Sequence, residues 1–218
     1  MKNALFVLLL IVGFCSFITK TKLISYRDQE ALHGKVRTYI ELSYEADNLG
    51  TIDSANVTSE KTLSFDKKGR LLTESYFYGD ESYSYEAFYN ENGTLKNVSG
   101  ADLDERYSEH DELGRFKKST VYTAESYDQP WHNYFTWEGS RLKSTKYIDA
   151  DWDQECHFIR NTLGFESVTI TVDEGKDTSS VLFYDYLELD KQENWLYRRV
   201  EDTVSKDISY EVRVYTYF

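Results

Sequence analysis

The chain has 218 residues, a formal net charge of −13, 19 tyrosines and a single proline. The negative charge argues against nucleic acid as a partner, because Lys and Arg supply the affinity for phosphates, and against docking on an anionic membrane through a basic patch. Aromatic residues make up 16% of the chain, which gives it enough apolar surface to fold and excludes intrinsic disorder.

The first residues are typical of an export signal. Lys2 supplies a positive start, and the run from Ala4 to Phe14 is apolar but shorter than the ~20 residues that cross a membrane as a helix. This pattern predicts a signal peptide over residues 1–19, with an uncleaved anchor as the alternative. Cys15 is a candidate lipidation site because it follows the apolar run, although lipoprotein signals prefer a small residue where Phe14 stands. The protein is therefore expected to be exported to the periplasm, outer membrane or extracellular space, with membrane contact only through this signal or a lipid anchor.

A change of pattern separates the N-terminal region from the rest of the chain. Residues 20–34 are predicted to form a linker or a short helix. From Lys35 the stretch "KVRTYIELSYEA" shows alternation with a period of two, which is typical of a β-strand. Residues 35–218 are predicted to form a single β-repeat domain.

Most of this domain repeats a motif around a glycine. Each copy has an aromatic or apolar strand end, a few polar residues, a glycine and a new alternating run. The glycines stand 21 to 25 residues apart, at Gly69, Gly93, Gly114, Gly139 and Gly164. A last copy follows in which we expect Asn194 to replace the glycine, because Asn also tolerates a positive φ. Trp195, next to it, is expected to pack as an anchor near the end of the array.

Each copy is predicted to be one β-hairpin. Glycine adopts a positive φ without steric cost, so "DKKGR", "NENGT" and "DELGR" are typical of hairpin turns. A lone hairpin is unstable in water, so neighbouring hairpins must pair edge to edge and bury their aromatic face. The sequence therefore predicts an all-β fold, an antiparallel meander of repeated β-hairpins that forms a curled or partly closed sheet.

The repeats resemble YD repeats, the tyrosine-aspartate repeats of the Rhs and teneurin type. The matching stretches are "FDKKGRLL", "YNENGTL" and "HDELGRF", and "YDYLELDKQENWLYRR" resembles a variant of the motif. The segment "LHGKVRTYIELSYEA" resembles the start of small exported YD-repeat proteins of Bacteroidetes-type bacteria. The resemblance covers residues 32–218 and implies an architecture without implying an activity. It departs from the motif at Gly139, which no Asp precedes, and at Gly164, which Phe and Glu follow in place of Arg and Leu.

Catalytic motifs do not emerge from the sequence. None of the four histidines lies in a zinc-binding spacing, and no phosphate-binding or nucleophile motif occurs. The chain is therefore predicted to be a non-catalytic protein without a cofactor. The alternative is a secreted, glycosidase-like hydrolase with a carboxylate pair, which 38 acidic residues can neither support nor exclude.

Two stretches are candidate binding sites. Asp149, Asp151 and Asp153 alternate in "DADWDQE" and are a weak candidate for calcium, which prefers several oxygen ligands; an acidic hairpin loop explains them equally well.

The second stretch is aromatic and surrounds the single proline. Its members are Tyr127, Trp131, Tyr134 and Trp137. Exposed rings bind sugars or anchor protein contacts, whereas inward rings belong to the core. The sequence thus predicts a cell-envelope or secreted β-repeat protein that binds a protein or polysaccharide partner or serves a structural role.

Overall fold

The structure is a computed structural model that describes residues 24–46, 51–52, 57–79, 81–100, 105–123, 129–149, 152–173 and 178–218. The predicted signal peptide with Cys15 lies outside the described residues, as do Tyr127 and Asp151.

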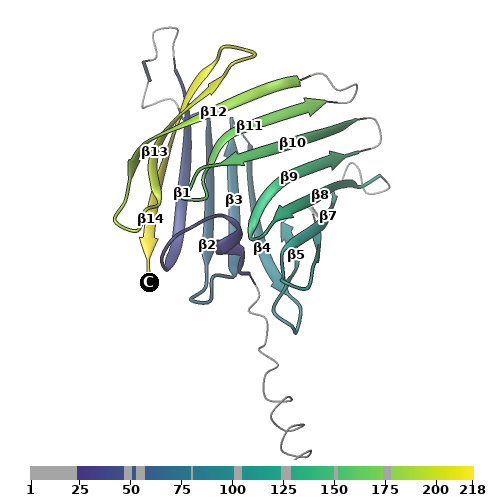
Figure 1. Cartoon of the computed structure of the whole chain (residues 1–218). Helices are drawn as coiled ribbons and strands as arrows, with labels where there is room; N and C mark the ends of the chain where they lie inside the picture. The colour runs from purple at the N-terminus through teal and green to yellow at the C-terminus, as the bar shows by residue number, and fades with distance from the viewer. Residues whose placement is uncertain are drawn as a thin grey trace, which may run out of the picture.

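The described residues form antiparallel strands and one short helix. The elements are α2 (Tyr26–Gln29), β1 (Val36–Glu45), β2 (Ser59–Phe65), β3 (Leu71–Tyr78), β4 (Glu81–Tyr89), β5 (Leu95–Gly100), β6 (Glu105–His110), β7 (Phe116–Tyr122), β8 (Trp131–Glu138), β9 (Arg141–Ile148), β10 (Asp153–Arg160), β11 (Glu166–Asp173), β12 (Thr178–Leu189), β13 (Trp195–Asp202) and β14 (Ile208–Tyr217). Each strand pairs with its neighbours in the chain, which confirms the predicted meander (Figure 1). No helix in this part of the chain is long and apolar enough to cross a membrane.

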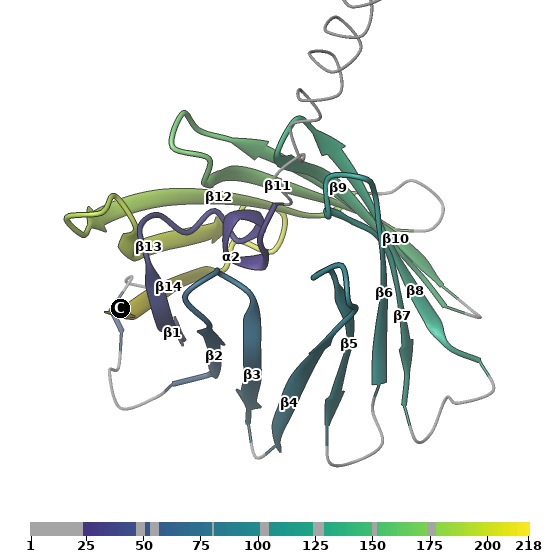
Figure 2. The ribbon, with the colours of Figure 1, turned by 90° about the horizontal axis from the view of Figure 1, so that it is seen from below.

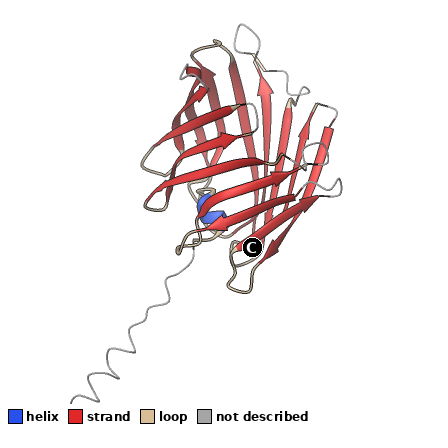
Figure 3. Ribbon diagram, turned by 90° about the vertical axis from the view of Figure 1, so that its right-hand side faces the viewer, coloured by secondary structure: helices blue, strands red, loops and turns tan. Residues whose placement is uncertain are grey.

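The sheet closes into a 14-strand barrel, and the prediction of a curled or partly closed sheet is wrong. β1 pairs with β14 from Val36↔Tyr217 to Glu45↔Ser209, which joins the two edges of the sheet. Figure 3 shows the strands, in red, arranged around the interior. The physical reason is a register shift in each of six hairpins, β2–β3, β4–β5, β6–β7, β8–β9, β10–β11 and β12–β13. A bulge increases the local twist, and a bulge repeated in these six hairpins coils the sheet until its edges meet.

Five hairpin turns at one end of the barrel share one geometry. In the first, Asp66 N–H donates to the carbonyl of Arg70 at 2.9 Å, and Gly69 N–H donates to the carbonyl of Asp66 at 3.0 Å. The same two bonds recur in the turns that begin at Asn90, Asp111, Asn161 and Asp190. The predicted hairpin turns are therefore confirmed, and the Asp or Asn of the motif is the residue that starts each of them.

The last of these turns corrects one expectation. Gly69 and Gly164 have φ angles of 82° and 92°, and the residue at the same place in the last turn is Glu193, with φ 66°. Asn194 follows it and does not replace the glycine. The left-handed residue stands three positions after the Asp that starts the turn, so the count from Asp190 ends at Glu193.

A hydrogen bond from an aromatic ring ties successive hairpins together. Each donor reaches the carbonyl of a residue that stands two positions after a left-handed residue. The pairs are Tyr89 to Leu71 at 2.8 Å, Trp137 to Phe116 at 2.6 Å, Tyr186 to Glu166 at 2.6 Å and Tyr215 to Trp195 at 3.0 Å. This bond gives the repeated aromatics a role beyond apolar burial.

The apolar core lies at the end of the barrel where these turns are, which we call the capped end. Residues 24–35, the cap segment, carry α2 and lie within the outline of the barrel (Figure 2). The buried core residues are Leu32, Val36, Tyr39, Leu63, Phe65, Leu71, Leu95 and Val98. The core therefore forms between the cap segment and strands β1–β3 and β5.

Relief of the left-handed strain at Glu193 is expected to stabilise the fold. Glu193→Gly removes a side chain from a conformation that costs L-residues about 1–2 kcal/mol, partly offset by the greater chain entropy of glycine. We expect a net gain of about 1 kcal/mol and a melting temperature higher by about 2–4 °C. The matched control is Gly164→Ala, which creates the same strain and should lower the melting temperature. A lower melting temperature for Glu193→Gly would contradict the assignment.

Candidate binding site at the capped end of the barrel

Backbone hydrogen bonds attach the cap segment to the turns. Ile24 N–H donates to the carbonyl of Leu113 at 2.9 Å, and Arg27 N–H donates to the carbonyl of Gly69 at 3.1 Å. A four-residue helix is too short to be stable alone. The capping box of Ser25 and Asp28 and the contacts with the barrel turns therefore hold α2 in place.

Asn194 joins the two ends of the described chain. Its side chain accepts a hydrogen bond from His33 N–H at 2.7 Å and donates to the carbonyl of His33 at 2.9 Å. It also donates to the hydroxyl of Tyr217 at 2.9 Å, and none of the residue is exposed. Asn194 therefore fixes the cap segment against the last turn and the last strand.

Inward-facing charges form ion pairs beside the cap. Arg213 Nε lies 2.6 Å from Glu41, and Arg198 Nε lies 2.5 Å from Glu211. Both guanidinium groups lie over the ring of Trp195, at 4.0 and 4.3 Å from its centroid. Trp195 is 2% exposed, which confirms the packing expected for it.

The two carboxyl groups differ in their electrostatics. Burial alone would raise the pKa of Glu41, but the charges of Arg213 and Lys61 outweigh burial and lower the pKa to about 2. Burial raises the pKa of Glu211, and the attraction of Arg198 offsets only part of this effect. Glu41 is therefore ionised over a wider range of pH than Glu211.

A second group of charges lies under the cap segment. Arg106 is 2.9 Å from Glu74, which is 2% exposed, and Lys61 is 3.7 Å from Glu30 of the cap segment. Tyr39 O–H donates to Glu30 at 3.4 Å. Buried charges need partners because desolvation is costly. The wide interior is therefore filled in part by paired charges in place of apolar side chains.

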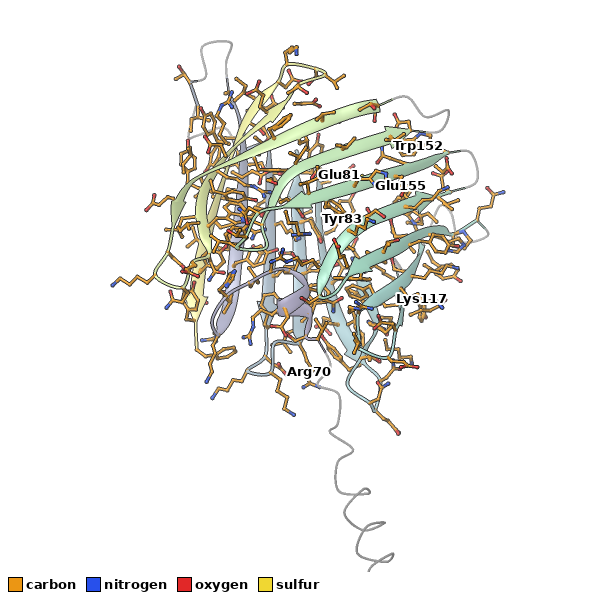
Figure 4. The ribbon with its side chains drawn as sticks, in the orientation of Figure 1. Arg70, Glu81, Tyr83, Lys117, Trp152 and Glu155 are labelled. Carbon is orange, nitrogen blue, oxygen red and sulfur yellow. The ribbon has the colours of Figure 1, made fainter. Side chains whose placement is uncertain are left out.

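Two pockets open between the cap segment and the barrel. The first, the Thr94 pocket, has a volume of about 230 Å³ and lies beside the turns that begin at Asp66, Asn90 and Asp111. Four of its lining residues carry rings: Tyr26, Tyr89, His110 and Phe116. Figure 4 shows Arg70, another lining residue, at the capped end of the ribbon, below the cap segment in that view.

The second pocket, the Leu163 pocket, has a volume of about 280 Å³. It lies between the cap segment and the two turns at residues 138–141 and 161–165, and His33, Arg141, Arg160 and Leu163 are among its lining residues. His33 Nε2 lies 3.3 Å from the carbonyl of Leu163. Both pockets therefore have walls that hydrogen bonds hold in place.

The structure separates the aromatic residues named from the sequence. Trp131 and Trp137 point to the inside of the barrel, where Trp131 contacts Tyr147 and Trp137 donates its ring N–H to Phe116. Tyr134, between them on β8, points outward and is 40% exposed. Tyr127 lies outside the described residues. The described members of this group thus face opposite sides of the sheet and form no common surface.

The acidic candidates lie at the opposite end of the barrel from the cap. Asp149 accepts hydrogen bonds from Trp152 N–H at 2.9 Å and from Tyr147 O–H at 3.0 Å, and Asp153 pairs with Lys146 at 2.6 Å. Asp151 lies outside the described residues. Among the described residues, no group of three or more metal-ligating side chains is placed to hold an ion.

Sequence reasoning missed the interior charges and Asn194. On β14, Glu211, Arg213 and Tyr215 share the inward face, whereas Val212 and Val214 face outward, and Val214 is 52% exposed. The sequence did contain a signal for this arrangement, because the charged residues of β14 alternate in step with its tyrosines. This alternation indicates that the charged face lies inside the barrel, whereas the usual rule places the apolar face of a strand inside.

No family model matches the chain, and no curated protein matches it. Among solved structures, the chain is similar to a porin-like protein from Bacteroides uniformis, with a TM-score of 0.48 and 10% identity over 83% of this chain and 96% of that one. A porin-like protein from Bacteroides vulgatus gives a TM-score of 0.47 and 11% identity over 83% of this chain and 98% of that one. A TcdB2-TccC3-Cdc42 structure gives a TM-score of 0.32 and 12% identity over 76% of this chain and 11% of that one. All three TM-scores are below 0.5, and we draw no argument about fold or function from these likenesses.

Removal of the Asn194 side chain is expected to loosen the cap. Asn194→Ala leaves buried groups of His33 and Tyr217 without this partner, and we expect a loss of about 3 kcal/mol. The measurement is urea unfolding, with amide hydrogen exchange in the cap segment as a local readout. Asn97→Ala, on the outer face of β5, is the control and should change little. Unchanged stability and exchange in Asn194→Ala would rule out this role.

The Glu41–Arg213 pair is expected to make stability depend on pH. The pKa of Glu41 is lower in the folded protein than its ordinary value, so the pair stabilises the fold above pH 4.5 and loses its effect as the pH falls toward about 2. Glu41→Gln should therefore cost about 3 kcal/mol at pH 7 and progressively less below pH 4.5.

The measurement is urea unfolding of the wild type and the variant at several pH values between 7 and about 2.5. This range reaches the pH at which Glu41 begins to be protonated. Glu86→Gln, exposed on the outer face of β4, is the control. A stability difference that is the same at pH 7 and pH 3 would contradict the assignment.

Proposed function

We propose that this chain is an exported, non-catalytic binding protein of the bacterial cell envelope that holds a protein or polysaccharide partner. The observation that carries the proposal is the pair of pockets at the capped end. Concave sites with rings and a few fixed polar groups are typical of ligand-binding surfaces. In the Thr94 pocket, the amide oxygen of Gln29 accepts from Phe116 N–H at 3.2 Å, which holds the wall of the pocket in place.

The repeat geometry supports a protein of the YD-repeat type. In the turns that begin at Asp66 and Asp111, the carboxylate accepts two backbone N–H bonds and also the Nε–H of Arg70 or Arg115. The Asp, the glycine and the Arg of the motif thus each have a separate physical task. This agreement favours the resemblance stated from the sequence.

Export is compatible with the described part of the fold. The first described contact is that of Ile24 with Leu113. Cleavage anywhere in the predicted signal, residues 1–19, leaves the cap segment intact. The signal peptide and the envelope location are therefore compatible with the complete barrel and its two pockets.

One observation favours the second candidate, a secreted hydrolase with a carboxylate pair. Glu41 and Glu211 lie on neighbouring strands two register positions apart, and their pKa values are shifted in opposite directions, as in an acid and base pair. Each carboxylate, however, accepts the Nε–H of an arginine, and neither lines the two pockets. We therefore favour the binding protein.

Expression of the full chain with a C-terminal tag in a Bacteroides host tests the proposal. We expect the protein in the envelope fraction, retention of an envelope partner on the immobilised protein, and no release of reducing sugar ends from envelope polysaccharide. Recovery in the cytoplasm would overturn the location. Release of reducing ends that Glu211→Gln abolishes and Glu86→Gln preserves would establish the hydrolase in its place.

A further inference from the structure

An arginine fills the space beside two of the repeated turns. Arg70 follows Gly69 and lies over the ring of Tyr89, with 5.1 Å from its guanidinium carbon to the ring centroid. Arg115 follows Gly114 and lies over the ring of Trp137 at 5.8 Å. In both repeats the arginine of one turn therefore covers the aromatic residue at the end of the next hairpin.

The second turn lacks this arginine. Thr94 follows Gly93, and the ring at the corresponding place in the next hairpin is that of His110. The short threonine leaves that ring uncovered, and both residues line the Thr94 pocket. The pocket of about 230 Å³ is thus the space that corresponds to the place of Arg70 and Arg115 in two other repeats.

The walls of the Thr94 pocket combine rings with positive charge. Phe116 contacts His110 at a centroid distance of 5.0 Å and Tyr26 at 5.6 Å, which makes one side apolar. Lys68 and Arg70 are the charged residues among the described lining of the pocket, and none of the described lining residues is a carboxylate. The Leu163 pocket also contains arginines, but Asp28 is among its lining residues. The Thr94 pocket therefore carries positive charge without a carboxylate among its described lining residues, in a chain with a net charge of −13.

The charge of the pocket is close to one positive unit. Asp66 accepts the Nε–H of Arg70 at 2.8 Å, so it balances much of that charge. Lys68 is exposed, and its backbone N–H, not its ammonium group, bonds to Asp66. One anionic group is therefore the charge that a ligand needs in order to match this site.

We propose that the Thr94 pocket binds a sugar acid, a hexose-sized ring that carries one carboxylate. The sugar ring packs against His110 and Phe116, and the carboxylate lies against Lys68 and the outer edge of Arg70. Thr94 borders the pocket, and its hydroxyl accepts from Asn90 Nδ2 at 3.0 Å and donates to Asn92 Oδ1 at 2.7 Å. This inference rests on the proposed binding function and names the ligand class of one of its pockets. Uronic acid units at the end of a polysaccharide have this chemistry.

Thr94→Arg tests the proposal by filling the pocket with a side chain that stands at this place in two other turns of the same barrel. The variant removes the Thr94 hydroxyl, so the turn loses its side-chain bonds to Asn90 and Asn92. The probes are glucuronate and glucose, and the measurements are saturation-transfer NMR and calorimetric titration of the full chain. We expect glucuronate to bind the wild type at least tenfold more tightly than glucose. Thr94→Arg should abolish this binding and lower the melting temperature by only a few degrees, because the two lost hydrogen bonds are exposed. Asn97→Arg, which adds the same charge on the outer face of β5, should bind as the wild type does.

A second variant checks the charge. Lys68→Gln should weaken glucuronate binding about tenfold and leave glucose binding unaffected. Equal binding of the two sugars, or full binding by Thr94→Arg, overturns the proposal.

These outcomes are independent of the envelope assignment. A chain that retains an envelope partner equally well with Thr94→Arg would keep the proposed function and lose this site. A chain that binds glucuronate and is found in the cytoplasm would keep this site and lose the envelope function.

Discussion

The pairing of β1 with β14 is the constraint on which the rest of the structure depends. Small barrels of about eight strands are filled by their own side chains, whereas wider ones leave space inside. A barrel of 14 strands therefore has an interior that the side chains of its wall do not fill completely. The cap segment supplies it at one end, and Asn194 links this segment to Tyr217 of the closing strand. Closure and capping are thus parts of one arrangement.

The interior charges follow from the same geometry. Long side chains such as Arg198 and Arg213 reach from the wall into space that aliphatic residues would leave empty, and Trp195 provides a flat surface for both. Each charge has a partner, because an unpaired charge at these buried places would be strongly destabilising. The apolar residues between them, such as Val212 and Val214, consequently face outward. The strands of the barrel wall therefore turn charged side chains inward, and the apolar core lies mainly beneath the cap segment.

The sites of interest lie where the repeat is interrupted. In the two copies that keep the arginine of the motif, its side chain fills the space beside the turn. Arg70 lies over Tyr89, and Arg115 lies over Trp137. Thr94 leaves one gap, and the short turn at residues 138–141, which lacks the starting Asp, borders the other. In the last turn, Glu193 stands where the other turns have glycine, and the next residue is the buried Asn194 that holds the cap segment. In this barrel, departures from the motif therefore coincide with the places where the chain has space or an extra contact.

The sequence by itself determined the strands, the turns and their order, because alternation and positive-φ glycines are local properties of a few residues. It also predicted the burial of Trp195. It did not determine whether the barrel closes, because closure depends on the sum of small twists over the whole sheet. The sequence of a single hairpin does not reveal that sum. Nor did it reveal which face is inside, because Glu211 and Arg213 become interior residues only once β14 meets β1. Asn194 and His33 lie 161 residues apart, and only the tertiary structure could decide that they meet.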